Sequence, residues 1–166
     1  LQLNARAAAR MTETREGADS ALLTDRAFCR DGYRIEDTFS CTSLIASGIR
    51  GHILAIGMLL RKLEKDGCGV RLGDIAGSYA PDKRIRGHQI GYRTTPNTYD
   101  AWSYEDYRRY YLDMMFFGVN TVEHIPYEKG VSNRNSLMQY DEEEFLVEAA
   151  RIADEYDLDV SVWHPN

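Results

Sequence analysis

The second half of the sequence alternates strand-like and helix-like patterns, and this order constrains the fold more than any other feature. Strands are predicted over residues 84–92, 120–125 and 158–163. Between them, apolar residues recur at helical spacing after Ser103 and again after Asp141. Strands that alternate with helices of this length form a parallel sheet with right-handed crossovers. The pattern therefore predicts an α/β fold, either an open doubly wound sheet or the start of a (β/α)8 barrel.

The loop after the first of these strands favours the barrel. A dinucleotide-binding sheet needs a glycine-rich turn at this place. Residues 94–102 carry threonine, proline, asparagine and aromatic residues instead. A barrel places its chemistry on the loops that follow the strands, and here those loops are long and polar.

The first half predicts a smaller α/β domain. Short strands are predicted at residues 33–35 and 43–46, and a helix from about residue 52 to residue 65, ended by Asp66 and Gly67. Residues 79–83 read as a linker. We predict a poorly determined segment over residues 1–31, an accessory α/β domain over 32–81 and the start of the barrel over 84–166.

Composition narrows the classes of partner and cofactor. The net charge of −6 argues against nucleic-acid and anionic-membrane binding. No apolar run reaches the roughly 20 residues that span a bilayer, and no signal-peptide pattern is visible. The three cysteines show no metal-binding spacing, so neither a disulfide framework nor a zinc site is predicted. No metal and no cofactor is assigned to the chain.

Polar and aromatic residues gather at the three predicted strands. Burying so many polar groups costs free energy unless a ligand binds them, so we expect a pocket for a polyhydroxylated or anionic small molecule. The candidate binding residues are Arg86, His88, Gln89, Tyr92, Arg93, Trp102, Glu123, His124, Trp163 and His164.

Several of these residues allow two interpretations. Glu123 and His124 are adjacent in a strand and point to opposite faces, so only one can face a barrel axis. Glu123 is a candidate acid or base, or an ion-pair partner of an arginine. His124 could instead be a structural histidine. A metal site formed by the histidines is an alternative whose spacing matches no familiar motif.

The arginines and tryptophans carry the sugar-binding prediction. Arg86 and Arg93 offer planar donor forks that match carboxylates and vicinal hydroxyl pairs, or they form ordinary ion pairs. Trp102 and Trp163 could stack on a sugar ring. Trp102 could equally pack its loop against the start of the following helix.

Three stretches resemble a known group of enzymes. Residues 49–51 and 56–61 resemble the helix of the small domain that precedes the barrel in many exo-glycosidases. Arg86 and Gly87 resemble the Arg-Gly pair that begins the barrel, and residues 86–102 with 117–123 are similar to bacterial hexosaminidase-like proteins. The resemblance covers about residues 32–166, and it is to family 20 β-N-acetylhexosaminidases and α-glucuronidases.

The resemblance implies a hexosaminidase-type accessory α+β domain followed by the first three β/α units of an incomplete TIM-type barrel. Arg86 matches the arginine that binds hydroxyls of the terminal sugar, an amino sugar or a uronic acid. The family's catalytic Asp-Glu pair follows the fourth strand, so this chain is expected to be an inactive fragment of a glycoside hydrolase. Alternatives are a non-catalytic carbohydrate-binding protein and a sugar-isomerase-like barrel. The open sheet edge also predicts self-association.

Overall fold

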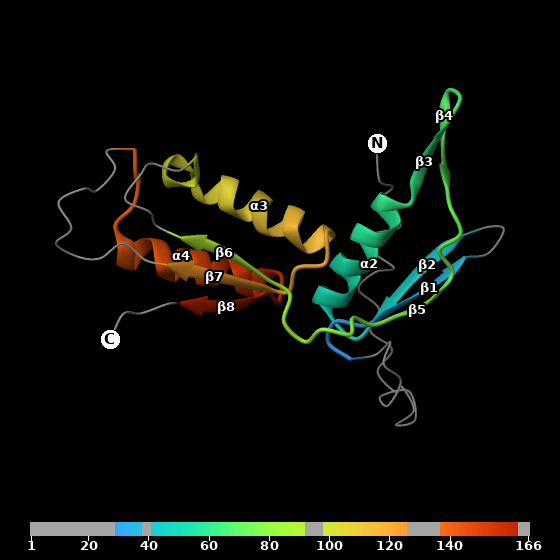
Figure 1. Cartoon of the computed structure of the whole chain (residues 1–166), viewed down its shortest axis with the longest axis horizontal. Coiled ribbons are helices and arrows are strands. Elements are labelled where there is room, and N and C mark those ends of the chain that lie inside the picture. The colour runs from blue at the N-terminus through green and yellow to red at the C-terminus, as the bar shows by residue number, and fades with distance from the viewer. Residues whose placement is uncertain (1–28, 38–40, 92–97, 126–136, 163–166) are drawn as a thin grey trace. The chain divides into compact units, whose positions relative to one another are not determined.

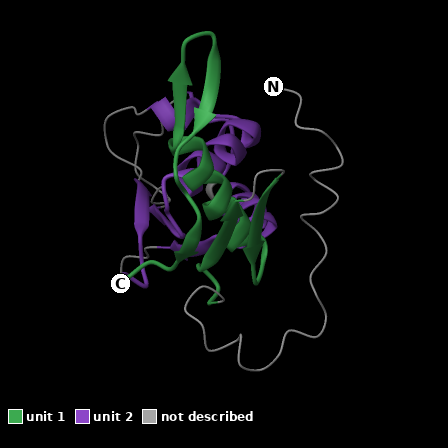
Figure 2. Ribbon diagram, turned by 90° about the vertical axis from the view of Figure 1, so that its right-hand side faces the viewer, with its two compact units in different colours: residues 1–82 green, residues 83–166 purple. Residues whose placement is uncertain are grey.

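The computed structural model describes residues 29–37, 41–91, 98–125 and 137–162. The chain divides into two compact units, unit 1 (Leu1–Asp82) and unit 2 (Lys83–Asn166), which Figure 2 distinguishes by colour. Among the described residues, unit 1 has two small sheets and one helix, and unit 2 has one sheet, two α-helices and a short 3-10 helix. The two units are therefore described separately.

Unit 1 is built on a three-stranded antiparallel sheet. Strand β1 (Tyr33–Asp37) lies between β2 (Thr42–Ala46) and β5 (Gly77–Tyr79). Tyr33 pairs with Ala46 on one side and with Tyr79 on the other. The strands predicted at residues 33–35 and 43–46 are thus confirmed, whereas Tyr79 belongs to a strand and not to a linker.

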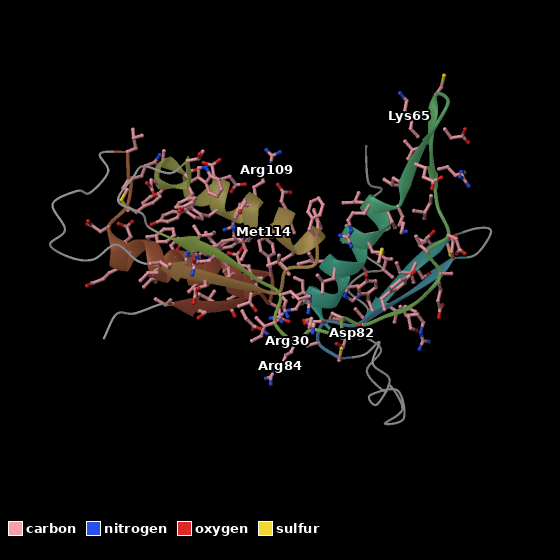
Figure 3. The ribbon with its side chains drawn as sticks, in the orientation of Figure 1. Arg30, Lys65, Asp82, Arg84, Arg109 and Met114 are labelled. Atoms are coloured by element: carbon pink, nitrogen blue, oxygen red, sulfur yellow. The ribbon has the colours of Figure 1, made fainter. Side chains whose placement is uncertain are left out.

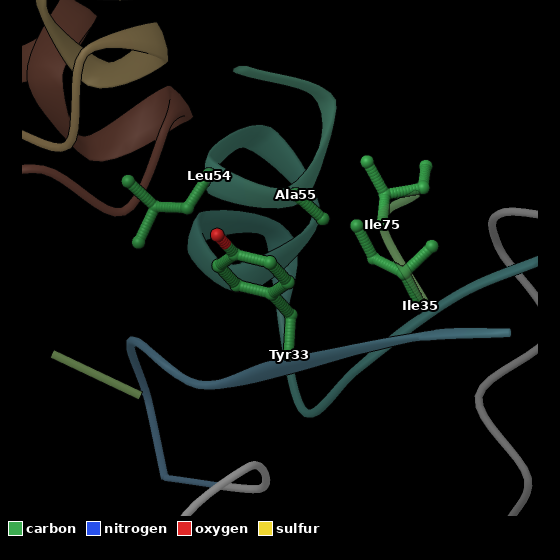
Figure 4. Close-up of a cluster of buried hydrophobic side chains, with 5 residues drawn as sticks. All are labelled: Tyr33, Ile35, Leu54, Ala55 and Ile75. Atoms are coloured by element: carbon green, nitrogen blue, oxygen red, sulfur yellow. The ribbon is translucent and has the colours of Figure 1, made fainter. Parts of the chain in front are cut away.

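Helix α2 (Ile49–Arg61) covers one face of this sheet. Figure 4 shows the buried side chains between them, which are Tyr33, Ile35, Leu54, Ala55 and Ile75. The alternation of β1 directs Tyr33 and Ile35 to the helix and leaves Arg34 between them partly exposed. Apolar burial in this cluster stabilises the packing of α2 on the sheet.

The end of the predicted helix is wrong. Helix α2 begins at Ile49 and ends at Arg61, and the next residues form a hairpin of β3 (Leu63–Asp66) and β4 (Gly69–Leu72). Gly67 lies in the turn with a φ of 56°, which glycine adopts without strain. Asp66 and Gly67 therefore belong to the end of β3 and the turn of a hairpin, and they do not cap a helix. Figure 1 shows this hairpin extending away from the sheet of unit 1.

Unit 2 confirms the predicted alternation of strands and helices. In chain order it contains β6 (Gly87–Gly91), the short 3-10 helix η3 (Thr98–Ala101), α3 (Tyr104–Phe116), β7 (Thr121–Ile125), α4 (Glu142–Glu155) and β8 (Asp159–Val162). The strands lie in the order β6-β7-β8 and both pairs are parallel (Figure 1). The protein is thus a mixed α/β chain, and the described residues form an open three-stranded sheet in unit 2, not a closed barrel.

Local sequence fixes both ends of α3. The Ser103 side chain accepts from the Asp106 amide, and the Asp106 carboxylate accepts from the Ser103 amide at 2.9 Å. These reciprocal bonds form the capping box that their spacing predicts. After the helix, Gly118 takes a φ of 98°, which ends it sharply.

The helices of unit 2 lie on the same face of its sheet. Helix α3 buries Tyr107, Tyr111, Met114 and Met115, and α4 buries Ala149, Ile152 and Ala153. Figure 3 shows Met114 on the inner side of α3 and Arg109 directed away from it. No described element covers the opposite face of this sheet.

Candidate ligand-binding face

The uncovered face of the unit 2 sheet carries polar side chains. Gln89, Glu123 and Ser161 are aligned across the three strands by the parallel register. Because side chains alternate along a strand, Thr121 and Asp159 share this face. We call these residues the polar face. All are at least partly exposed.

A hydrogen bond joins two residues at the centre of the polar face. Gln89 Nε2 donates to Glu123 Oε2 at 2.6 Å. A bond to a carboxylate is stronger than one between neutral groups, so the pair is held in a defined geometry. Glu123 keeps acceptor capacity at its other oxygen, and the Gln89 amide offers a second donor and an acceptor. The pair can therefore bind adjacent hydroxyl groups.

The sequence reasoning missed three members of this face. Thr121, Asp159 and Ser161 were not predicted as site residues, although β8 reads as alternating polar and apolar residues. That alternation separates Asp159 and Ser161 from Val160 and Val162. It could have assigned both polar residues to the face that holds Glu123.

His124 lies on the opposite face, beneath the helices. It is 1% exposed, and its Nε2 lies 2.6 Å from the Tyr111 hydroxyl. Burial lowers the pKa of His124 from 6.5 to about 4, so the imidazole is neutral at pH 7. This environment supports the structural interpretation of His124.

His88 and Trp102 also lie on the helix side. His88 Nε2 is 2.9 Å from the Tyr110 hydroxyl, and the ring of Trp102 contacts Tyr110 at a centroid distance of 4.8 Å. Trp102 also contacts Tyr99 and Tyr107. Trp102 thus packs its loop onto the start of α3, one of the two interpretations that the sequence left open.

Arg86 lies at the amino-terminal edge of the sheet, just before β6. Its Nε donates to the Gly118 carbonyl and its Nη1 to the Lys83 carbonyl, both at 2.7 Å. These bonds fix the chain that enters β6 and β7. Sugar binding by Arg86 stays a prediction, and its observed contacts are structural.

Four predicted site residues lie outside the described residues: Tyr92, Arg93, Trp163 and His164. In the part of the chain that is described, no three histidine, cysteine, aspartate or glutamate side chains are grouped to hold a metal ion. The described helices likewise include none with the length and apolar character needed to cross a membrane.

Comparison of the sequence with protein-family models and with curated proteins finds no match. The functional argument therefore depends on the geometry of unit 2 and on the resemblance carried by its residues.

Proposed function

We propose that unit 2 is part of a glycosidase-type β/α barrel and binds carbohydrate through its polar face. The observation that carries this proposal is the Gln89–Glu123 pair at the centre of the sheet face that no described element covers. The resemblance to family 20 β-N-acetylhexosaminidases and α-glucuronidases supports the same assignment. The ligand is a hydroxyl-rich sugar, an amino sugar or a uronic acid.

The type of residue on the polar face supports a binding role. Parallel sheets are usually covered on both faces and are rich in aliphatic residues. Here one face is built from Gln89, Glu123, Ser161 and their polar neighbours. Polar groups that would be buried in a complete barrel need hydrogen-bond partners, and sugar hydroxyls supply both donors and acceptors.

Binding and not hydrolysis is the role proposed for these residues. Glycoside hydrolysis needs two carboxyl groups that flank the glycosidic oxygen, or one with a substrate acetamido group. In the resembling enzymes the catalytic pair follows the fourth strand of the barrel, whereas the described residues of unit 2 form three strands. We therefore expect the isolated chain to bind sugar without turning it over.

Replacing Glu123 by glutamine should weaken sugar binding about 10-fold, because a hydrogen bond to a charged group contributes roughly 1.5–3 kcal/mol, of which glutamine keeps part. The measurement is calorimetric titration with N-acetylglucosamine and with glucuronate. Asp113→Asn is the matched control, since it removes the same charge from an exposed position on α3.

Two results would contradict the proposal. One is that the wild-type chain binds neither sugar at millimolar concentration. The other is that Glu123→Gln and Asp113→Asn bind equally to the wild type, which would place the ligand away from the polar face. Hydrolysis of a chromogenic glycoside by the purified chain would contradict the expected lack of turnover.

A further inference from the structure

His124 lies where the sheet of unit 2 and both of its helices meet. Its ring contacts Tyr111 of α3 and, edge-on at 5.3 Å, Phe145 of α4. On the neighbouring strands, Ile90 and Val162 are aligned with it. A change in the charge of this one side chain therefore acts on three elements together.

The surroundings of His124 accommodate a neutral ring only. Among the described residues its one hydrogen-bond partner is the Tyr111 hydroxyl, and Tyr111 is itself 0% exposed. The buried Nδ1 has no hydrogen-bond partner among the described residues. Phe145, Ile90 and Val162 carry no charge, and Glu123 points to the opposite face.

Protonation would place a charge in this apolar site. An imidazolium has two N–H donors, whereas a neutral ring has one donor and one acceptor. The Tyr111 hydroxyl could accept one of the two donors. The other would stay buried without a partner, and no described residue places an opposite charge beside it, so protonation is costly.

We propose that protonation of His124 in mild acid releases α3 and α4 from the sheet, so that unit 2 contains a pH-sensitive switch. The opened state exposes the imidazole to water and binds the proton that the closed state excludes. This inference concerns the packing of unit 2 and is independent of the proposed sugar binding.

The direction of the pH effect follows from the proton affinities of His124 in the closed and the opened state. Burial lowers the pKa of His124 from 6.5 to about 4 in the closed state. The stability that unit 2 gains from keeping His124 neutral is therefore fully present above pH 6.5. It is lost progressively as the pH falls from 6.5 towards 4. At pH 5 the opening equilibrium constant should be roughly 30-fold higher than at pH 8.

Urea titration of the whole chain, followed by tryptophan fluorescence at pH 8 and pH 5, measures this change. The sequence has two tryptophans, Trp102 and Trp163, and both belong to unit 2. His124→Gln should abolish most of the roughly 30-fold difference, because glutamine can accept from Tyr111 but does not titrate. Carboxyl groups contribute equally to wild type and variant, so the difference between them isolates His124.

His88→Gln is the matched control, since His88 is exposed and bonded to a tyrosine in the same way. It should keep the full pH dependence. If His124→Gln does not fold, the double variant His124→Phe with Tyr111→Phe removes both polar groups. It should also lose most of the difference between pH 8 and pH 5. The proposal is overturned if the wild type changes less than 3-fold between the two pH values (roughly a tenth of the expected effect), or if the folded His124 variant keeps the wild-type dependence.

Discussion

Replacing Asn120 by alanine is expected to lower the free energy of unfolding of unit 2 by about 3 kcal/mol, because it leaves main-chain groups at the start of β6 without partners. Asn120 is 1% exposed. Its Oδ1 accepts from the Arg86 amide and its Nδ2 donates to the Arg84 carbonyl, both at 2.8 Å. Its own amide and carbonyl bond to Arg86 and Asp159. The Asn120 side chain thus holds the chain that enters β6, while the Asn120 main chain bonds to the residues that precede β6 and begin β8.

Two substitutions separate this role from a simple loss of packing. Asn120→Asp keeps the acceptor for the Arg86 amide but loses the donor to Arg84, so we expect a substantial loss as well. Thr121→Val removes only the 3.1 Å bond from Thr121 Oγ1 to Asn120 Oδ1 and should cost about 1 kcal/mol or less.

Urea titration followed by tryptophan fluorescence measures the free energy of unfolding of unit 2 in the three variants. Equal losses for Asn120→Ala and Thr121→Val would contradict the role assigned to the asparagine amide. A lower slope of free energy against urea would instead indicate a changed unfolded state.

The order of elements in unit 2 could be predicted because its causes are local. Apolar spacing, the Ser103–Asp106 cap and the glycine at residue 118 each act within a few residues. The hairpin of unit 1 was missed because Leu63 continues the helical spacing of α2. Its pairing with Leu72 is a tertiary fact that no short window contains.

The candidate site was only half predictable for a similar reason. Alternation alone places Glu123 and His124 on opposite faces, but it does not say which face the helices cover. That choice depends on Tyr111 and Phe145, which come from two different helices. The partners of Arg86 could not be predicted either. They are the main-chain carbonyl groups of Lys83 and Gly118, which every residue type carries.

In unit 1, Gly51→Ala is expected to destabilise the fold by about 2 kcal/mol, although alanine is the better helix former by about 1 kcal/mol. A Cβ at this position would lie 2.7 Å from the Ala46 Cβ and 2.7 Å from the Gly32 carbonyl oxygen. Neither neighbour is the end of a flexible side chain. Helix α2 would therefore have to move away from the sheet, which loosens the cluster around Tyr33 and Ile35.

Gly48→Ala tests whether the close approach is the cause. No atom lies within 4 Å of a Cβ built at Gly48, three residues earlier in the chain. Its φ of −163° is extended and open to any residue, so the loss should stay below about 1 kcal/mol. Hydrogen exchange at the amides of β1 and β2 measures both variants. Greater protection in Gly51→Ala than in the wild type would mean that helix propensity outweighs the contact, and that the sheet yields at Gly32.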